Sequence, residues 1–130
     1  MKFTKIKVFL SVLVVVILVI VGVYFFNNRE DTSGKYNTFA ECLKDKGAVF
    51  YGAFWCPHCQ AQKKLFGSSK QYLNYVECST PDASNQTQIC KDKKILGYPT
   101  WEFIDGSRIN GDATLQMLSD KTGCPLPVVQ

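Results

Sequence analysis

Trp55-Cys56-Pro57-His58-Cys59 (WCPHC) stands where an apolar stretch of the chain changes to a helical pattern. The stretch before it, residues 48–55 (AVFYGAFW), is short and rich in aromatic side chains, which indicates a buried strand. Proline is favoured in the first turn of a helix, so Pro57 predicts a helix that ends near Gly67. The two cysteines are therefore expected at the junction of a strand and a helix.

This junction suits sulfur chemistry. Cys56 would meet the unpaired backbone N–H groups and the positive dipole end of the helix, and both stabilise a thiolate. Pro57 starts the helix and a protonated His58 adds positive charge, so these two residues are predicted to tune the ionisation of Cys56. Disulfide exchange also needs a second thiol to resolve the mixed disulfide. Cys59, one helical turn further on, is predicted to be that thiol.

Two other interpretations of the Cys-x-x-Cys spacing stay open. The spacing is also half of a common zinc site, but such a site needs a second close pair, and Cys78 and Cys90 have eleven residues between them. Cys56 and Cys59 could also form a purely structural disulfide. We predict redox exchange instead, with no metal ion and no separate cofactor.

An uncharged apolar segment, residues 8–26, lies near the N-terminus. As a helix it spans roughly 28 Å, about the thickness of the hydrocarbon core of a bilayer. Its length, and the lack of small residues for a cleavage site after it, favour an uncleaved transmembrane anchor over a signal peptide. Residues 1–7 carry three lysines, which favour a cytoplasmic N-terminus. We therefore predict a single-pass protein of the plasma membrane whose C-terminal domain is extracytoplasmic.

The rest of the chain predicts one small domain, residues 36–130, behind a polar linker at residues 27–35. Of the formal net charge of +4, residues 1–35 contribute +3, from five basic and two acidic residues. The domain therefore gives no electrostatic support for nucleic-acid binding. A composition of 46% hydrophobic and 20% charged residues excludes a disordered or fibrous chain.

The domain alternates between helical and strand patterns. Thr38 followed by Glu41 predicts a capping box that opens a helix over residues 38–46. The other expected elements are a strand over 72–78, a helix over 83–94, a hairpin turning at Asp105-Gly106, and a helix that Asp112 caps and Gly123 ends. The resulting order α-β-α-β-α-β-β-α predicts an α/β fold, a mixed sheet with helices on both faces.

Two motifs together resemble thioredoxin-fold thiol-disulfide oxidoreductases: WCPHC after an apolar strand, and Tyr98-Pro99-Thr100 about forty residues later. More narrowly, residues 50–60 (FYGAFWCPHCQ), residues 75–78 (YVEC) and residues 97–101 (GYPTW) are similar to the thioredoxin-like domain of bacterial vitamin K epoxide reductase homologues. The quinone-reducing, multi-helix part of those proteins has no counterpart in this sequence.

The resemblance implies a thioredoxin-like fold for residues 36–130 and a cis peptide bond before Pro99. The backbone of Tyr98 would then be free to pair with an extended substrate strand beside Cys56. The substrate-binding residues implied in this way are Trp55, Tyr98, Pro99 and Thr100. Trp55 could equally be a core residue, and both interpretations stay open.

Two departures from common thioredoxins favour an oxidase. Phe50 stands where many thioredoxins carry a buried acid, so no acid is expected there to accept the proton of Cys59. The Pro-His dipeptide matches the oxidising disulfide oxidases of the Dsb family. We expect the protein to oxidise thiols of exported proteins and to be reoxidised by a quinone-linked membrane protein of the vitamin K epoxide reductase or Dsb type. The alternatives are a reductase or isomerase that receives electrons through the membrane, and a non-catalytic, disulfide-stapled adaptor.

The remaining four cysteines allow three pairings. Cys78 and Cys90 are closest in sequence, and a disulfide between them would stabilise the fold by roughly 3 kcal/mol. Cys42 and Cys124 would then tie the ends of the domain together. A second redox pair is the competing role for these two, and their spacing disfavours it.

Overall fold

The computed structural model describes residues 2–27 and 33–128 and divides the chain into two compact units, residues 1–30 and 31–130. The first unit is a single helix, α1 (Lys2–Asn27). Within it, residues 6–26 form a segment long and apolar enough to cross a membrane, and all its side chains are exposed. An apolar surface on every side of a helix is stable only in an apolar environment, so α1 is a candidate transmembrane segment.

The predicted linker at residues 27–35 falls largely on residues 28–32, which lie outside the described residues. Its last residues are described. The backbone N–H of Gly34 donates to Ser68 Oγ at 3.1 Å, and the N–H of Tyr36 donates to Ser69 Oγ at 3.2 Å. Gly34 and Tyr36 thus connect this segment to the 3₁₀ helix η1 (Gly67–Tyr72).

The second unit has the predicted order of helices and strands, with one 3₁₀ helix added. Its elements are α2 (Asn37–Asp45), β1 (Val49–Gly52), α3 (Pro57–Leu65), the 3₁₀ helix η1 (Gly67–Tyr72), β2 (Tyr75–Glu77), α4 (Gln88–Asp92), β3 (Thr100–Glu102), β4 (Arg108–Asn110) and α5 (Leu115–Thr122). The mixed sheet has the order β2-β1-β3-β4, in which β1 is parallel to β2 and antiparallel to β3. The thioredoxin-like α/β fold is therefore confirmed.

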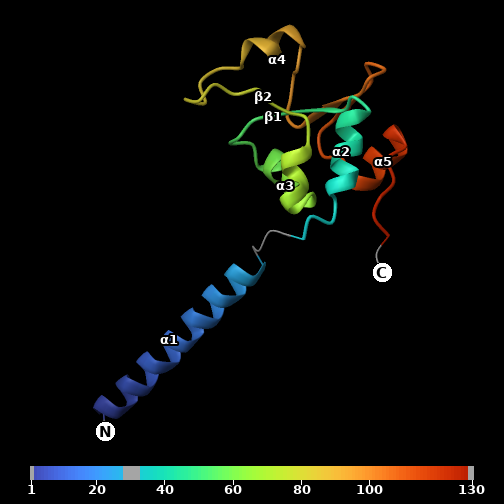
Figure 1. Ribbon diagram of the computed structural model, residues 1–130. Helices are drawn as coiled ribbons and strands as arrows, with labels where there is room; N and C mark the ends of the chain where they lie inside the picture. The colour runs from blue at the N-terminus through green and yellow to red at the C-terminus, as the bar shows by residue number, and fades with distance from the viewer. Residues whose placement is uncertain (1, 28–32, 129–130) are drawn as a thin grey trace. The chain divides into compact units, whose positions relative to one another are not determined.

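Helices cover both faces of this sheet, as Figure 1 shows, with α4 on one face and α2, α3 and α5 on the other. Side chains alternate along a strand, so Phe50 points into the larger core beneath α2, α3 and α5, and Tyr51 points into the smaller core beneath α4. In the larger core the ring of Phe50 stacks on Trp101 with their centroids 4.9 Å apart. Strand β1, whose C-terminal end leads to α3, is thus held by packing on both faces of the sheet.

The first strand is shorter than predicted. It ends at Gly52, and the apolar residues that follow turn away from the sheet, with the N–H of Cys56 donating to the carbonyl of Ala53 at 3.0 Å. Phe54 and Trp55 are about half exposed. An apolar run predicts burial but does not show where the backbone leaves the sheet, so the prediction of a buried strand through Trp55 was wrong for its last three residues.

Two predicted helix caps were also wrong. Helix α2 begins at Asn37, one residue before the predicted range, with Tyr36 rather than Thr38 at its N-cap and no side-chain cap. Helix α5 is capped by Thr114, whose hydroxyl accepts the N–H of Met117 at 3.1 Å, because Asp112 lies too far before the helix. Gly123 ends α5 as predicted, in a left-handed conformation with φ 73° that glycine adopts at little cost.

The helix predicted over residues 83–94 is reduced to α4. Asp82 accepts hydrogen bonds from the hydroxyl groups of Thr80 and Ser84 at 2.5 and 2.7 Å, and Ala83 has a positive φ of 57°. Side chains that bond to their neighbours in this way compete with helix formation. The strand predicted over residues 72–78 is likewise shortened to β2, because η1 extends to Tyr72.

Candidate active site

Cys56 and Cys59 lie at the junction of β1 and α3. Cys56 is the N-cap residue of α3, Pro57 is its first helical residue, and the Cys56 sulfur accepts the backbone N–H of Cys59 at 3.4 Å. Both residues are free cysteines, with exposed fractions of 5% for Cys56 and 1% for Cys59. The helix N-terminus therefore donates to the first sulfur, as the position of Pro57 predicted.

The second sulfur has very different surroundings. Burial and, to a smaller extent, the neighbouring Cys56 raise the pKa of Cys59 from 9.0 to about 12, although a backbone hydrogen bond and the charge of Lys63 oppose the rise. Cys59 is therefore a thiol at neutral pH that ionises only with assistance. This difference suits an exchange in which Cys56 forms the mixed disulfide with a substrate cysteine and Cys59 reacts only with Cys56.

His58 points to an unexpected partner. Its Nδ1 lies 2.9 Å from Asp112 Oδ2, and both side chains are largely exposed. Asp112, which the sequence suggested as a helix cap, instead brings a negative charge to the residue predicted to tune Cys56. The two residues are 54 positions apart and Asp112 is in a loop, so no sequence pattern indicates this pair.

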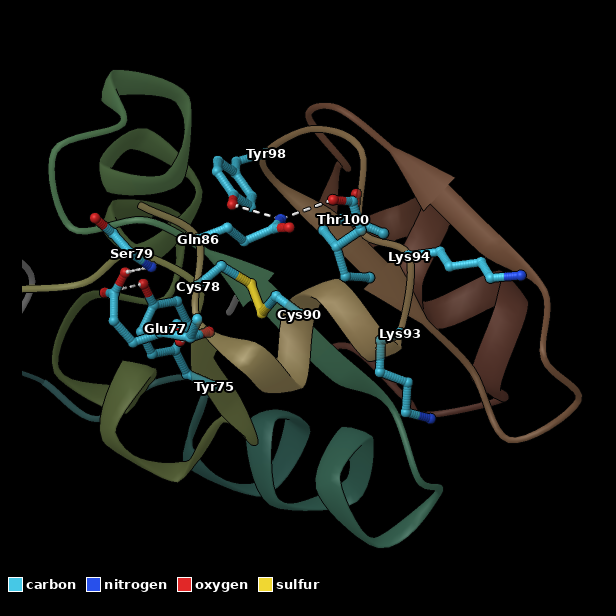
Figure 2. Close-up of a disulfide and its surroundings, with 12 residues drawn as sticks. Tyr75, Glu77, Cys78, Ser79, Gln86, Cys90, Lys93, Lys94, Tyr98 and Thr100 are labelled. Atoms are coloured by element: carbon cyan, nitrogen blue, oxygen red, sulfur yellow. Dashed lines mark hydrogen bonds between the residues drawn. A yellow bond between two sulfur atoms is a disulfide. The ribbon is translucent and has the colours of Figure 1, made fainter. Parts of the chain in front are cut away.

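The loop before β3 lies beside Cys56. The peptide bond between Tyr98 and Pro99 is cis, as the resemblance implied, and the Cys56 thiol donates to the Tyr98 carbonyl at 3.8 Å. Gln86 holds this loop, because its Nε2 donates to the Tyr98 hydroxyl and to the carbonyl of Ile95, both at 2.8 Å, as Figure 2 shows for Tyr98. The loop thus presents its backbone to the first cysteine.

The other residues implied for substrate binding differ in accessibility. The Trp55 side chain is 49% exposed, its ring meets the Tyr98 ring edge-on at 6.1 Å, and its Nε1 donates to Ser79 Oγ at 2.8 Å. Of the two interpretations, the rim is therefore favoured over the core. Pro99 and Thr100 are buried, and the Thr100 hydroxyl donates to the carbonyl of Gly97 at 2.9 Å. These two side chains therefore support the Tyr98 loop from the protein interior.

Position 50 carries a phenylalanine instead of an acid, but the neighbouring strand β2 carries a glutamate. Glu77 in β2 accepts the hydroxyl of Tyr75 at 2.7 Å, and Tyr75 lies close to the ammonium group of Lys63 in α3. Tyr75 and Glu77 belong to the segment YVEC that carries the resemblance, but the sequence assigned no role to them or to Lys63. The spacing of Cys59 and Lys63, one helical turn apart, was visible in the sequence, but their approach to Tyr75 depends on the pairing of β1 with β2.

The other four cysteines form two disulfides, Cys78–Cys90 and Cys42–Cys124, which are the pairings that the sequence favoured. The first joins the end of β2 to α4 beneath the Tyr98 loop (Figure 2), and the second joins α2 to the segment after α5. Within the described part of the chain, no group of three His, Cys, Asp or Glu side chains could hold a metal ion.

Comparison with known proteins agrees with this geometry. The model of the thioredoxin family matches residues 30–121, which include both cysteines and the Tyr98 loop. The chain is also 39% identical over 108 residues to the thiol-disulfide oxidoreductase LTO1 of Arabidopsis thaliana, a match that covers 79% of this chain and 28% of that protein. The domain therefore has the fold and the cysteine pair of the thioredoxin type, and the chain spans about a quarter of the length of that relative. With the fold, the cysteine pair and the match in agreement, the chain belongs to the thioredoxin family.

Proposed function

We propose that the protein is a membrane-anchored oxidoreductase that faces outward from the plasma membrane and passes a Cys56–Cys59 disulfide to thiols of exported proteins. The observation that carries this proposal is the contrast between the two sulfurs. The helix N-terminus donates to Cys56 in the reduced protein, and stabilising the reduced form makes the disulfide a stronger oxidant. The residue at position 50 is a buried phenylalanine, so no carboxylate there assists the opposite reaction.

The proposed reaction has two exchange steps. A substrate thiolate attacks Cys56 Sγ, the Cys56–Cys59 bond breaks, and Cys59 leaves as a thiolate that takes a proton from water. A second thiolate of the substrate then attacks the substrate sulfur of the mixed disulfide, and Cys56 leaves as a thiolate. The substrate gains a disulfide and loses two electrons, which the two cysteines hold as thiols.

Substrate would lie along the exposed rim beside Cys56. Trp55 and Phe54 offer apolar surface there, and the Tyr98 backbone is within 3.8 Å of the Cys56 sulfur. An extended segment around a substrate cysteine could pair with that backbone, with side chains packed on Trp55. Such a surface recognises backbone and general apolar character, which suits a range of exported proteins.

The extracytoplasmic location is supported from both units of the chain. Helix α1 is a candidate anchor, and three lysines among residues 1–7 favour a cytoplasmic N-terminus. The domain carries two disulfides besides the active-site cysteine pair, as proteins of oxidising compartments commonly do. The reduced cysteine pair would return its two electrons to a quinone-linked membrane protein of the vitamin K epoxide reductase or Dsb type, an assignment that rests on the sequence resemblance.

Trapping of mixed disulfides in cells that express the full chain tests the proposal. Cys59→Ser should accumulate disulfide-linked complexes between Cys56 and exported proteins, because the sulfur that would release Cys56 is gone. The matched variant Cys56→Ser should trap few, since the Cys59 sulfur lies against Gly52 in the core, whereas the Cys56 sulfur lies beside the Tyr98 backbone. Equal and negligible trapping by both variants would support the adaptor instead, and complexes with cytoplasmic proteins would overturn the orientation.

A further inference from the structure

A lysine, a tyrosine and a glutamate converge beside Cys59 through the periodicities of one helix and one strand. Lys63 follows Cys59 by four residues on α3, so the two side chains lie on the same side of that helix. Tyr75 and Glu77 are two residues apart on β2 and share one face of the sheet. Tyr75 packs against Phe50 in the larger core, so this face is the one that α3 covers.

The contacts within this group form a chain. Lys63 Nζ lies 3.3 Å from the centroid of the Tyr75 ring, and the Tyr75 hydroxyl donates to Glu77 Oε2 at 2.7 Å. Glu77 Oε1 accepts the backbone N–H groups of Phe54 and Ser79 at 3.2 and 2.9 Å, and Figure 2 shows Glu77 between Tyr75 and Ser79. Backbone N–H groups therefore hold Glu77, and Glu77 holds the hydroxyl of Tyr75. The Tyr75 ring in turn holds the ammonium group of Lys63.

Gly52 brings Cys59 up against this group. A Cβ atom at Gly52 would lie 3.0 Å from the Cys59 sulfur and 3.0 Å from Tyr75 Cε2, closer than packed atoms normally approach. The sulfur and the ring therefore share the space that the missing side chain leaves. Since Lys63 sits on that same ring, its charge is close to the buried sulfur.

The electrostatics agree with this placement. Burial lowers the pKa of Lys63 below 10.5, while Glu77 and Cys59 raise it and Lys70 of η1 lowers it further. In return, the charge of Lys63 opposes the burial that raises the pKa of Cys59. An ordinary surface lysine would be fully solvated, and its charge would be screened from any buried group.

We propose that Lys63, held on the Tyr75 ring, stabilises the negative charge that Cys59 carries when its sulfur leaves the Cys56–Cys59 disulfide. In that step a substrate thiolate forms a bond to Cys56 Sγ, the bond between the two cysteines breaks, and Cys59 departs as a thiolate beside the ammonium group before it takes a proton from water. The rate of exchange depends on the stability of the leaving thiolate. Lys63 is thus a charge-positioning residue for the buried sulfur.

This inference rests on the exchange proposed for Cys56 and Cys59, and it assigns a role that the residue at position 50 cannot fill. A phenylalanine there offers neither charge nor proton. The charge comes instead from the helix that carries the cysteines, and the neighbouring strand β2 supplies its support.

Single-turnover kinetics on the full chain in detergent test the assignment. The oxidised protein is mixed with excess glutathione, and the fluorescence change of the half-exposed Trp55 reports the opening of the disulfide. Lys63→Met should slow this step by about tenfold or more, the effect of one opposite charge near an ionising group. Lys64→Met is the matched control, because Lys64 is the next residue on α3, carries the same charge and is exposed. It should change the rate less than twofold.

The pH profile separates an electrostatic role from a structural one. The ratio of the wild-type rate to the Lys63→Met rate should be largest near neutral pH, where Lys63 is charged. As the pH rises through the lowered pKa of Lys63, the ammonium group loses its proton and the ratio of the two rates should fall toward one. This fall should occur at a pH below 10.5, the ordinary pKa of a lysine. Ionisation of glutathione affects both proteins equally. Lys63→Arg should restore most of the rate, because guanidinium also stacks on aromatic rings and stays charged.

The outcomes are distinct. If wild-type protein exchanges with glutathione but Lys63→Met and Lys64→Met behave alike, Lys63 has no role and only this inference fails. A ratio that does not change with pH, or a Lys63→Arg variant as slow as Lys63→Met, would mean a packing role and would also overturn it. If wild-type protein does not exchange at all, the proposed function fails first.

Discussion

The two sulfur atoms of one Cys-x-x-Cys pair occupy contrasting environments. Cys56 meets a helix N-terminus, the Tyr98 backbone and a rim of exposed aromatic side chains, whereas Cys59 meets the packed core, a glycine and the Lys63 group. The first environment is open to another protein and the second is not. Two identical side chains therefore take different roles in disulfide exchange, because their surroundings decide which sulfur a substrate can reach and what stabilises the charge on each sulfur.

The Cys78–Cys90 disulfide joins the end of β2 to α4, and its removal is the largest perturbation that we expect. Cys78→Ala combined with Cys90→Ala should lower the free energy of unfolding by about 3 kcal/mol, because the unfolded chain gains freedom. Exchange with glutathione should persist, since Cys78 and Cys90 lie in the smaller core, whereas Cys56 and Cys59 lie in the larger one. Chemical denaturation and the exchange rate measure the two effects. Lost exchange with unchanged stability would mean that this disulfide serves the chemistry.

A smaller change acts on the Cys59 side alone. Gly52→Ala places a Cβ atom 3.0 Å from both the Cys59 sulfur and the Tyr75 ring, so core atoms must move at a cost of roughly 1 to 3 kcal/mol. The opening of the disulfide should slow, while alkylation of reduced Cys56 should keep its rate. Gly97→Ala is the matched control beside the Tyr98 loop, where an added Cβ meets nothing within 4 Å. Equal stability of the two variants would show that the packing at Gly52 is loose.

Much of the fold was predictable because its signals are local. WCPHC fixed the start of α3, and the Asp105-Gly106 turn lies between β3 and β4 as predicted. Local signals failed where two residues compete for one role. Asp112 and Thr114 are both good helix caps two positions apart, and the sequence does not show that Asp112 lies near His58 instead.

The candidate site also contains residues that were predictable from the sequence and residues that were not. The motif residues, the cysteine pair and the Tyr98-Pro99 loop, are recognisable from sequence because they stand at short, fixed spacings. Lys63 and Tyr75 meet only through the register that pairs Phe50 with Tyr75, which long-range packing decides. Side-chain contacts that cross from a helix to a strand therefore need the assembled fold.

The reduction potential of the Cys56–Cys59 pair, measured against glutathione buffers, tests the central claim most directly. The stabilised Cys56 side predicts a potential above the value of about −270 mV that is typical of thioredoxin. His58→Ser should lower the potential by on the order of 30 mV, the equivalent of a tenfold change in the exchange equilibrium, because it removes the imidazole that pairs with Asp112 and leaves that carboxylate without it. A potential near −270 mV that His58→Ser leaves unchanged would contradict the oxidase assignment and favour a reductase.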